Sequence, residues 1–399
     1  MRLSSTNSTT GVRLKPTRVV IKLGTALLTT GGGSLDRATI SNIVRQITRV
    51  HSGGVSTLVV TSGAVAAGKE ILDRSGSPYE YPNRITSFRQ VMASLGQTQL
   101  MHLYEELFGN HGIIVGQALV SRSDLQSRLG YLNVRNTLET LLDVKAIPII
   151  NENDVVAVEE LENEVFGDND KLSAMVANVV DADLLILLGE MSGLYTADPH
   201  VDPKAQLIRE VKHINSGVIK AAGQDRDGRG RGGMASKVDA ARLATSTGTE
   251  VVIASGHELD VVLRLCRGER LGTTFLTSVS RLEAKKRWIM TGVSESRGSV
   301  VADGGAVKAL RDHGKSLLLA GVVSVIGNFS RGDIIAVNTR TSEVIGWGLA
   351  NYASHEIAVI KEHSSLGASK LLVNKYGPEV IHRNNLALQG NPFTKETEQ

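Results

Sequence analysis

The sequence predicts an α/β protein: an open, mostly parallel sheet with helices on both faces, followed by a small domain of mainly β structure. Near-continuous apolar strands alternate with helical patterns from about residue 18 to residue 254, which is typical of a parallel sheet covered on both faces. After about residue 280 the apolar segments become short and are separated by Gly, Asn and Asp, as in antiparallel β structure. The chain of 399 residues is long enough for both parts, at roughly 150 residues per domain.

The elements of the first part follow from the spacing of apolar residues. A strand is expected at 19–23, and after it a helix from Asp36, a plausible N-cap, with Ile40, Ile43 and Val44 on one face. The same reasoning predicts the remaining strands at 57–61, 113–118, 147–150, 184–188 and 251–254, and helices after residue 63 and at 84–108, 131–142, 171–180 and 236–247. Ligands of such sheets bind beyond the carboxyl ends of the strands.

The second part is predicted from short β-prone segments. They lie at 288–291, 299–301, 322–326, 333–337 and 343–349. We therefore expect a disordered tail over 1–16, a large domain over 17–278, a small domain over 282–385 and a C-terminal tail over 386–399. The first 16 residues are rich in Ser and Thr and lack acids. A frayed tail is favoured there over a weak mitochondrial transit peptide.

Composition excludes several classes of protein. Apolar residues make up 41% and charged residues 21%, which excludes a disordered or fibrous chain. The one cysteine, Cys266, excludes a disulfide framework and a thiolate metal cluster and fits a reducing, cytoplasmic setting. The formal net charge of +3 does not require a nucleic-acid or membrane partner. No apolar run approaches the roughly 18 residues of a membrane span.

Two stretches nearly match known phosphate-binding motifs. Residues 63–69 have the glycine and lysine spacing of a P-loop, but Glu70 stands where a hydroxyl must hold Mg²⁺. Residues 228–233 satisfy G-x-G-x-x-G, but no strand leads directly into them. Neither a P-loop nor a dinucleotide fold is expected.

The same glycines suit a different anion site. Residues 228–237 run into a predicted helix, which would bring backbone N–H groups, a hydroxyl and Lys237 to a positive helix end. A flexible basic surface loop explains the run equally well. Lys22 lies at the carboxyl end of the first strand, two residues before Gly24, although such a lysine is often only an edge residue that reaches solvent.

Polar residues also cluster after two other predicted strands and before one predicted helix. Ser62 follows the strand at 57–61, residues 151–154 (NEND) follow the strand at 147–150, and residues 167–170 (GDND) precede a helix. Such groups can bind an ammonium group, orient lysines or hold a cation, or they can form turns and an N-cap at Asp170. The acidic stretch 159–164 is expected to be a solvated loop. The ten histidines show no ligand spacing, so structural zinc and a Cys/His nucleophile lack support.

Together these stretches resemble the amino-acid kinase family, and within it the kinases that act on the γ-carboxylate of glutamate. The resemblance is carried by 20–25 (VIKLGT), 60–68 (VTSGAVAAG), 150–154 (INEND), 167–170 (GDND), 193–199 (GLYTADP) and 232–237 (GGMASK), in order over about 18–270. Residues after 285, with RWI at 287–289 and GNFSRG at 327–332, resemble the PUA domain appended to many of these kinases.

The resemblance implies phosphorylation of the L-glutamate γ-carboxylate by ATP with Mg²⁺, the first step of proline biosynthesis. It implies that Lys22 and Lys237 stabilise the transferring phosphoryl group and that Asp170 orients both lysines. The implied glutamate-binding residues are Ser62, Asn151, Asp154, Asp168 and Asn169. The implied ATP-binding residues are Lys22, Gly189, Glu190, Arg231, Gly232, Gly233, Met234, Ala235, Ser236 and Lys237. No protein metal site is expected, since Mg²⁺ would be carried by the ATP phosphates.

The resemblance also carries expectations about control and partners. It implies inhibition by proline, with Asp124 in the segment tied to that control, a homo-oligomer (dimer or tetramer), and a hand-off of the acyl phosphate to glutamyl-phosphate reductase. The chain departs from the family at Gly189-Glu190, where Thr-Asp is common, and at Arg231, where Thr is usual. Two alternatives stay open: a kinase of the same fold for another small acid, and an RNA-binding protein acting through the C-terminal domain. Residues 285–385 lack a dense basic stripe or stacked aromatic set, which disfavours RNA.

Overall fold

The computed structural model describes residues 15–31, 33–76, 86–156, 169–223, 233–277, 279–280, 283–284, 289–290, 297–362 and 376–389. The chain divides into two compact units. Among the described residues, the first unit comprises 15–125 and 134–277 and the second comprises 126–133 and the residues from 279 onward. Of the helices in these ranges, none is both long and apolar enough to cross a membrane.

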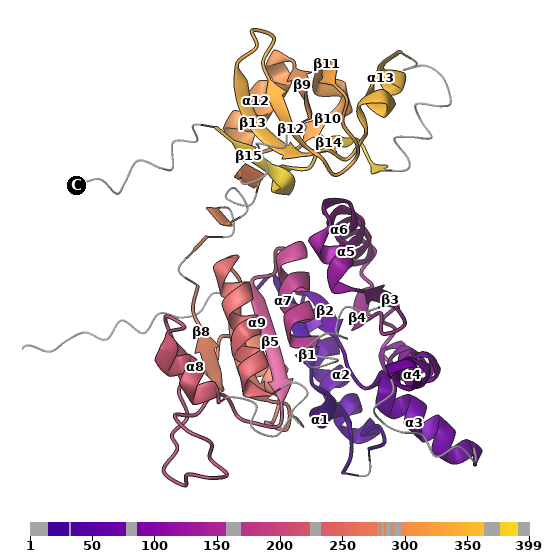
Figure 1. Cartoon of the computed structure of the whole chain (residues 1–399), viewed down its shortest axis with the longest axis vertical. Coiled ribbons are helices and arrows are strands. Elements are labelled where there is room, and N and C mark those ends of the chain that lie inside the picture. Colours follow the sequence, from indigo (N-terminus) through magenta and orange to yellow (C-terminus); the bar gives the residue numbers. More distant parts are fainter. Residues whose placement is uncertain are drawn as a thin grey trace, which may run out of the picture. The chain divides into compact units, whose positions relative to one another are not determined.

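The first unit is built on an eight-stranded sheet with the order β3-β4-β2-β1-β5-β7-β8-β6 (Figure 1). Its strands are β1 (Arg18–Leu23), β2 (Ser56–Val60), β3 (Val115–Val120), β4 (Ile147–Glu152), β5 (Leu184–Gly189), β6 (Glu210–Val211), β7 (Glu250–Ser255) and β8 (Thr273–Phe275). The six strands from β3 to β7 in this order pair in parallel, as the apolar runs predict, and β8 pairs antiparallel to β7. The short strands β6 and β8 have too few residues to show a pattern in the sequence.

Helices cover both faces of this sheet. They are α1 (Thr25–Leu28), α2 (Arg37–Ser52), α3 (Ala64–Ser75), α4 (Thr86–Gly109), α5 (Arg122–Gln126), α6 (Arg128–Asp143), α7 (Asn169–Val179), α8 (Ser216–Ala222), α9 (Met234–Ser246) and α10 (Val261–Cys266). The alternate strand residues Val19, Ile21 and Leu23 pack in one buried core with apolar residues of α2, α4 and α10. The helices α7 and α9 pack on β1, β5 and β7 and lie on the near side of the sheet in Figure 1. The prediction of helices on both faces is confirmed.

Local packing explains the starts of two helices. The Asp36 side chain accepts hydrogen bonds from the backbone N–H groups of Ala38 and Thr39, which confirms the expected N-cap of α2. In contrast, α7 begins at Asn169 rather than at Lys171, so Asp170 lies in its first turn and is not an N-cap. This difference decides where the carboxylate of Asp170 points.

Strand pairing moves two predicted boundaries. The sequence predicts a strand at 113–118, but β3 begins at Val115, because the Ile113 N–H still bonds the Phe108 carbonyl after α4. The sequence ends the next strand at Ile150, but β4 continues through Asn151 and Glu152, which pair with Leu119 and Val120 of β3. Asn151 is therefore held on a strand and not in a turn.

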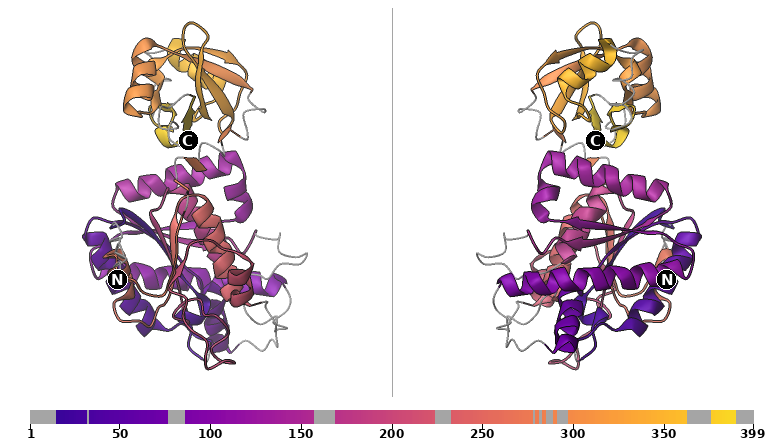
Figure 2. Two further views of the ribbon diagram at one scale, coloured as in Figure 1. Left: turned by 90° about the vertical axis from the view of Figure 1, so that its left-hand side faces the viewer. Right: turned by 90° about the vertical axis from the view of Figure 1, so that its right-hand side faces the viewer.

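The second unit has a five-stranded sheet of order β11-β9-β12-β13-β15 and a two-stranded sheet of β10 and β14. Its elements are β9 (Gly298–Ala302), α12 (Gly304–His313), β10 (Leu317–Leu318), β11 (Val322–Gly327), β12 (Ile334–Asn338), β13 (Val344–Leu349), α13 (Ser354–Glu362), β14 (Glu379–Ile381) and β15 (Leu386–Leu388), with short 3₁₀ turns at Leu319–Gly321 and Arg383–Asn385. A separate apolar core, which includes Val300, Ile335 and Tyr352, lies within this unit. The mainly β character is confirmed, and Figure 2 shows its sheet and helices from two sides.

Two predictions for the second unit are wrong. The segment 288–291 was expected to be β-prone, but its described residues, Ile289 and Met290, are helical. The segment from 386 was expected to be a tail, but β15 lies there and pairs antiparallel with β13, from Gly346↔Leu388 to Gly348↔Leu386. Three residues are too few to mark a strand unless the partner strand is known.

Candidate functional site

Two lysines and one aspartate meet in the buried interior at the carboxyl end of β1. Lys22 lies on β1, Asp170 in the first turn of α7 and Lys237 in the first turn of α9, and they are 2%, 0% and 7% exposed. One Asp170 carboxylate oxygen pairs with Lys22 Nζ. The other lies 3.2 Å from Lys237 Nζ and accepts a 2.7 Å hydrogen bond from Ser236 Oγ. We call Lys22, Asp170 and Lys237 the lysine–aspartate cluster.

The charges of this cluster control the ionisation of its carboxylate. Burial alone would raise the pKa of Asp170, but the positive charges of Lys22 and Lys237 and the hydrogen bonds from Lys22 and Ser236 lower that pKa to about 2. Asp170 is therefore ionised throughout the physiological range. With two ammonium groups and one carboxylate, the cluster carries one formal positive charge, which favours an anion nearby.

The lysines of the cluster line a cavity of about 150 Å³. Of the residues predicted to bind ATP, Lys22, Gly189, Glu190, Gly233, Met234 and Lys237 line it. Ser236 instead bonds Asp170, and Ala235 is not in the lining. Arg231 and Gly232 lie outside the described residues. The lining also includes Ala26, Leu27, Met191 and Ile253, which the sequence reasoning missed because they carry no charge or motif. Thr25 lines it as well; it belongs to the stretch 20–25 but was not predicted to bind a ligand. We call this space the smaller cavity.

Backbone geometry makes room for an anion in the smaller cavity. A Cβ on Gly24 would lie 3.2 Å from the Leu188 carbonyl oxygen and 3.9 Å from Lys22 Nζ, so glycine keeps the space around the ammonium open. The helix α9 begins at Met234, and its N-cap residue, Gly233, has no side chain to bond the first N–H groups of the helix. These N–H groups and the positive end of the helix suit phosphate oxygens.

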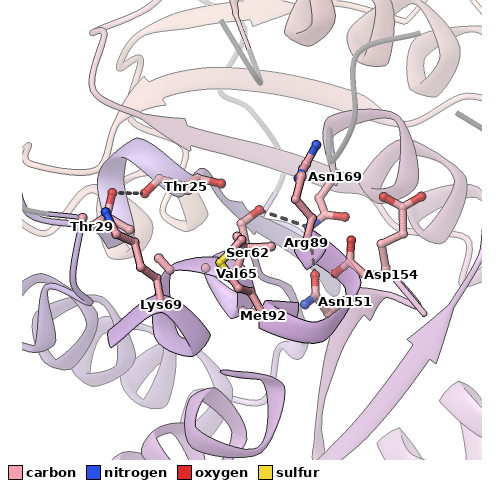
Figure 3. A pocket seen from close by; sticks show the side chains of 15 residues that line it. Thr25, Thr29, Ser62, Val65, Lys69, Arg89, Met92, Asn151, Asp154 and Asn169 are labelled. Carbon is pink, nitrogen blue, oxygen red and sulfur yellow. Dashed lines mark hydrogen bonds between the residues drawn. The ribbon is translucent and has the colours of Figure 1, made fainter. Parts of the chain in front are cut away.

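A second cavity, of about 390 Å³, opens beyond the end of β2 and β4 (Figure 3). Ser62, Asn151, Asp154 and Asn169, four of the five residues predicted to bind glutamate, line it. The fifth, Asp168, lies outside the described residues. We call this space the larger cavity. Thr25 lines both cavities, so the two adjoin at that residue.

The larger cavity also contains charged residues that the sequence reasoning missed. Lys69, on α3, lines the cavity but appeared in the sequence only as part of the rejected P-loop match. Arg89, on α4, also lines it, and no sequence pattern marked it because it does not follow a predicted strand. Glu152 completes the charged lining. In Figure 3, Lys69 and Thr29 lie toward one end of the cavity and Asp154 toward the other. Cations and carboxylates in one cavity suit a ligand that carries charges of both signs.

Asn169 lines this cavity and carries a buried acceptor. Its Nδ2 group lies 2.6 Å from the Thr61 carbonyl oxygen, 3.0 Å from Ser62 Oγ and 2.9 Å from Asn151 Oδ1, three acceptors that share its two hydrogens. Asn169 is 4% exposed, and within the described part of the chain its Oδ1 has no hydrogen-bond partner. A buried carbonyl oxygen without a donor is costly, so this atom favours a ligand with an N–H group.

The larger cavity depends on a glycine at the end of β2. Gly63 has a φ of 101° and is the N-cap of α3; a residue with a Cβ rarely adopts this backbone conformation. The turn at Gly63 lets α3 start two residues after Ser62, so the first residues of α3 line the cavity. The glycine–lysine spacing of 63–69 therefore reflects a turn and a helix.

Asp124 lies elsewhere. Its carboxylate accepts hydrogen bonds from the N–H and Oγ of Ser121, at 2.8 and 2.6 Å, at the start of α5. Asp124 is not among the residues that line the two cavities. Its link to inhibition stays a prediction.

Comparisons with known proteins identify the regions of similarity. The amino acid kinase family model matches residues 17–255, and the PUA domain model matches residues 298–370. Among curated proteins, the chain is 46% identical over 371 residues to "Glutamate 5-kinase" of Dehalococcoides mccartyi, covering 93% of this chain and 98% of the relative. It is 44% identical to "Glutamate 5-kinase" of Herpetosiphon aurantiacus, covering 92% and 97%. Among solved structures, UMP kinase from Bacillus anthracis matches with a TM-score of 0.46 and 18% identity, over 67% of this chain and 98% of that chain.

Proposed function

The chain belongs to the amino acid kinase family, and from this premise we propose that it transfers the γ-phosphoryl group of ATP to the γ-carboxylate of L-glutamate. The products are L-glutamyl 5-phosphate and ADP, and the reaction is the first step of proline biosynthesis. The observation that supports this best is the pair of cavities that adjoin at Thr25, one beside the cationic lysine–aspartate cluster and the other lined by charges of both signs.

The reaction needs charge neutralisation more than proton transfer. A γ-carboxyl group with a pKa near 4.3 is already ionised at neutral pH, so it attacks without a general base. One carboxylate oxygen forms a bond to the γ-phosphorus while the bond to the β,γ-bridging oxygen breaks, and ADP leaves with that electron pair. Two anions must approach each other, which is why positioned cations dominate catalysis of phosphoryl transfer.

The lysine–aspartate cluster supplies those cations. In the proposal, Lys22 neutralises the transferring phosphoryl group. Lys237 neutralises the nucleotide side, because it lies in the first turn of α9, whose N-terminal residues Gly233 and Met234 line the smaller cavity. Asp170 holds both ammonium groups in place through its two carboxylate oxygens. Arg231, Gly232 and Gly233 belong to the glycine-rich segment that we propose cradles the phosphates.

L-Glutamate occupies the larger cavity in this proposal, with its γ-carboxylate toward Thr25. Its α-ammonium group then lies toward Asp154, where the Asn169 Oδ1 atom accepts a hydrogen bond from it. Arg89, which also lines this cavity, pairs with the α-carboxylate. Asp168 is proposed as a further neighbour of the amino group.

Mg²⁺ accompanies ATP in this proposal. Among the described residues, no three His, Cys, Asp or Glu side chains gather as a metal site, and the Asp170 carboxylate is already bound by two lysines and a serine. These residues do not fit an ion held by the protein alone. We therefore propose that the phosphate oxygens of ATP bring Mg²⁺ to the site.

Several further properties belong to the same proposal. We propose that the chain acts in the cytoplasm as a homo-oligomer, that proline inhibits it, and that the acyl phosphate passes to glutamyl-phosphate reductase. The acyl phosphate product is a reactive mixed anhydride, so rapid consumption by a reductase limits its loss to water.

The direct test is ADP release with ATP, Mg²⁺ and L-glutamate, with hydroxylamine added to trap the acyl phosphate as a hydroxamate. We expect turnover with L-glutamate that far exceeds turnover with L-aspartate or N-acetyl-L-glutamate, and a lower rate when proline is added. Equal turnover of L-aspartate or N-acetyl-L-glutamate would assign the chain to another small-acid kinase.

A further inference from the structure

We propose that Gln97, on α4, is a positioning residue of the larger cavity: it holds Asn151 in the orientation that accepts a hydrogen bond from Asn169. Through Asn151 it supports the orientation in which Asn169 offers an oxygen to the α-ammonium group of the substrate. Gln97 does not line the cavity. It acts through Asn151, which does. The inference rests on the proposed function, because it concerns how the same site recognises L-glutamate.

Three side-chain amides form a chain that ends at the cavity. Gln97 Oε1 accepts a 2.8 Å hydrogen bond from Asn151 Nδ2, and Asn151 Oδ1 accepts a 2.9 Å bond from Asn169 Nδ2. Asn169 Nδ2 also donates to the Thr61 carbonyl oxygen at 2.6 Å. Figure 3 shows Asn151 and Asn169 joined at the cavity wall.

Each amide of the chain determines the orientation of the next. The Thr61 backbone carbonyl can only accept, so Asn169 must turn its Nδ2 group toward it. Asn169 Nδ2 then requires the Oδ1 atom of Asn151, and Asn151 is left with a donor that needs an acceptor. Gln97 Oε1 is that acceptor. With all amides oriented in this way, Asn169 Oδ1 is the atom without a described partner.

The packing of α3 against α4 brings Gln97 within reach of Asn151. A Cβ on Gly96 would lie 1.8 Å from the Ala64 carbonyl oxygen, and a Cβ on Gly68 would lie 1.8 Å from the Met92 carbonyl oxygen. The two helices therefore touch backbone to backbone beside the cavity. Gln97 directly follows Gly96 and is held there by this contact.

This arrangement favours a substrate with an ammonium group at that position. If Gln97 no longer offers its Oε1 atom, Asn151 Nδ2 loses the hydrogen bond to it. The side-chain amide of Asn151 can then rotate. Asn169 then loses one of the bonds that orient its side-chain amide. Recognition of the ammonium group weakens, whereas the lysine–aspartate cluster that promotes the chemical step stays intact.

The test compares Gln97→Met, which removes the acceptor, with Gln97→Glu, which keeps it. Gln97 Nε2 has no hydrogen-bond partner within the described ranges, so the change to Glu loses no described bond. For each variant, the kcat and KM for L-glutamate are measured by ADP release, together with the Ki of glutarate as a competitor. Glutarate has both carboxylates of glutamate and lacks the ammonium group. Gln99→Met, on the same helix at a residue that lines neither cavity, is the control.

We expect Gln97→Met to raise the KM for L-glutamate about tenfold, as for a weakened hydrogen bond to a charged group. Its kcat and the Ki of glutarate stay near the wild-type values, and Gln97→Glu and Gln99→Met behave as the wild type. The inference is overturned if Gln97→Met leaves the KM unchanged, or if the KM for glutamate and the Ki of glutarate rise by the same factor. If the wild type does not turn over L-glutamate, the proposed function fails, which is a different result.

Discussion

Lys22 and Lys237 illustrate how two buried cations share one carboxylate. Replacing either with Met keeps most of the side-chain volume and removes the charge. We expect kcat to fall at least about 100-fold in each variant, the loss typical of one removed charge-stabilising donor. The measurement is ADP release with L-glutamate, with circular dichroism as a check on folding. The control is Lys220→Met, at an exposed residue of α8, which should keep full activity. Near-normal turnover in the Lys22 or the Lys237 variant would exclude that lysine from catalysis.

The low pKa of Asp170 has a consequence for stability. In the folded protein the pKa is about 2, below the value of roughly 3.9 in an unfolded chain. Because the folded state holds the carboxylate in its ionised form, this group stabilises the folded protein at pH values above the pKa of the unfolded chain. The stabilisation is lost as the pH falls from about 4 toward 2. We expect the melting temperature of the wild type to exceed that of Asp170→Asn near neutral pH, and the gap to narrow below pH 4. A gap that stays constant from pH 6 to pH 3 would contradict this assignment.

Arg89 offers a test of how the substrate lies in the larger cavity. If its guanidinium pairs with the α-carboxylate, Arg89→Gln should raise the KM for L-glutamate by about 10- to 100-fold, as for a lost charged hydrogen bond. The same change should affect L-isoglutamine, in which that carboxylate is an amide, by less than about threefold. Arg45→Gln, at an exposed residue of α2, is the charge-matched control. An equal loss for both substrates would place the α-carboxylate elsewhere.

Among the elements, α3 and α4 show that two glycines matter for helix packing. Gly68 and Gly96 are the points at which the two helix backbones touch. A Cβ on Gly96 would also lie 2.3 Å from the Gly68 backbone nitrogen, so a larger residue must separate the helices. Because Arg89, Met92 and Gln97 all lie on α4, this separation would disturb the larger cavity.

We therefore expect Gly96→Ala to destabilise the protein by about 1–3 kcal/mol, the usual cost of overpacking, and to raise the KM for L-glutamate. Thermal denaturation and ADP release measure the two effects. Gly109→Ala, at the last residue of the same helix where a Cβ meets nothing within 4 Å, is the control and should change little. Wild-type stability in Gly96→Ala would show that the helices can part without cost.

At the scale of the whole molecule, two apolar cores among the described residues have no residue in common. One core draws its residues from β1 through α10, and the other from β9 through β15. Both proposed ligand cavities are lined by residues of the first unit. Ligands that bind only the folded first unit stabilise that unit, by about 2.7 kcal/mol at a concentration 100 times the Kd.

Differential scanning calorimetry of the full chain should then show two transitions. The non-hydrolysable ATP analogue AMP-PNP, added with Mg²⁺ and L-glutamate, should raise the midpoint of one transition by several degrees and leave the other in place. Addition of L-alanine instead of L-glutamate controls for a general solute effect. An equal shift of both transitions would show that the two units unfold together.

Much of this architecture could be predicted from the sequence, because strong local patterns specify it. The apolar runs of β1, β2, β4, β5 and β7 predicted a parallel sheet, and polar residues singled out at their ends line the larger cavity. Lys22, Asp170 and Lys237 were predicted to act together, and the structure brings them into contact. A charged side chain that follows a buried strand or begins a helix is visible without knowledge of the fold.

Contacts between distant segments were decided only by the tertiary structure. Arg89 and Gln97 lie within a long helix with no strand end near them, so no local pattern marks them. The strand β15 exists because β13 offers it a partner, and Asn151 became part of a strand because β3 pairs with it. The sequence alone determined which residues have the chemistry to bind ATP and glutamate. The tertiary structure decided which donors and acceptors face each cavity, because hydrogen-bond direction depends on partners that lie far apart in the chain.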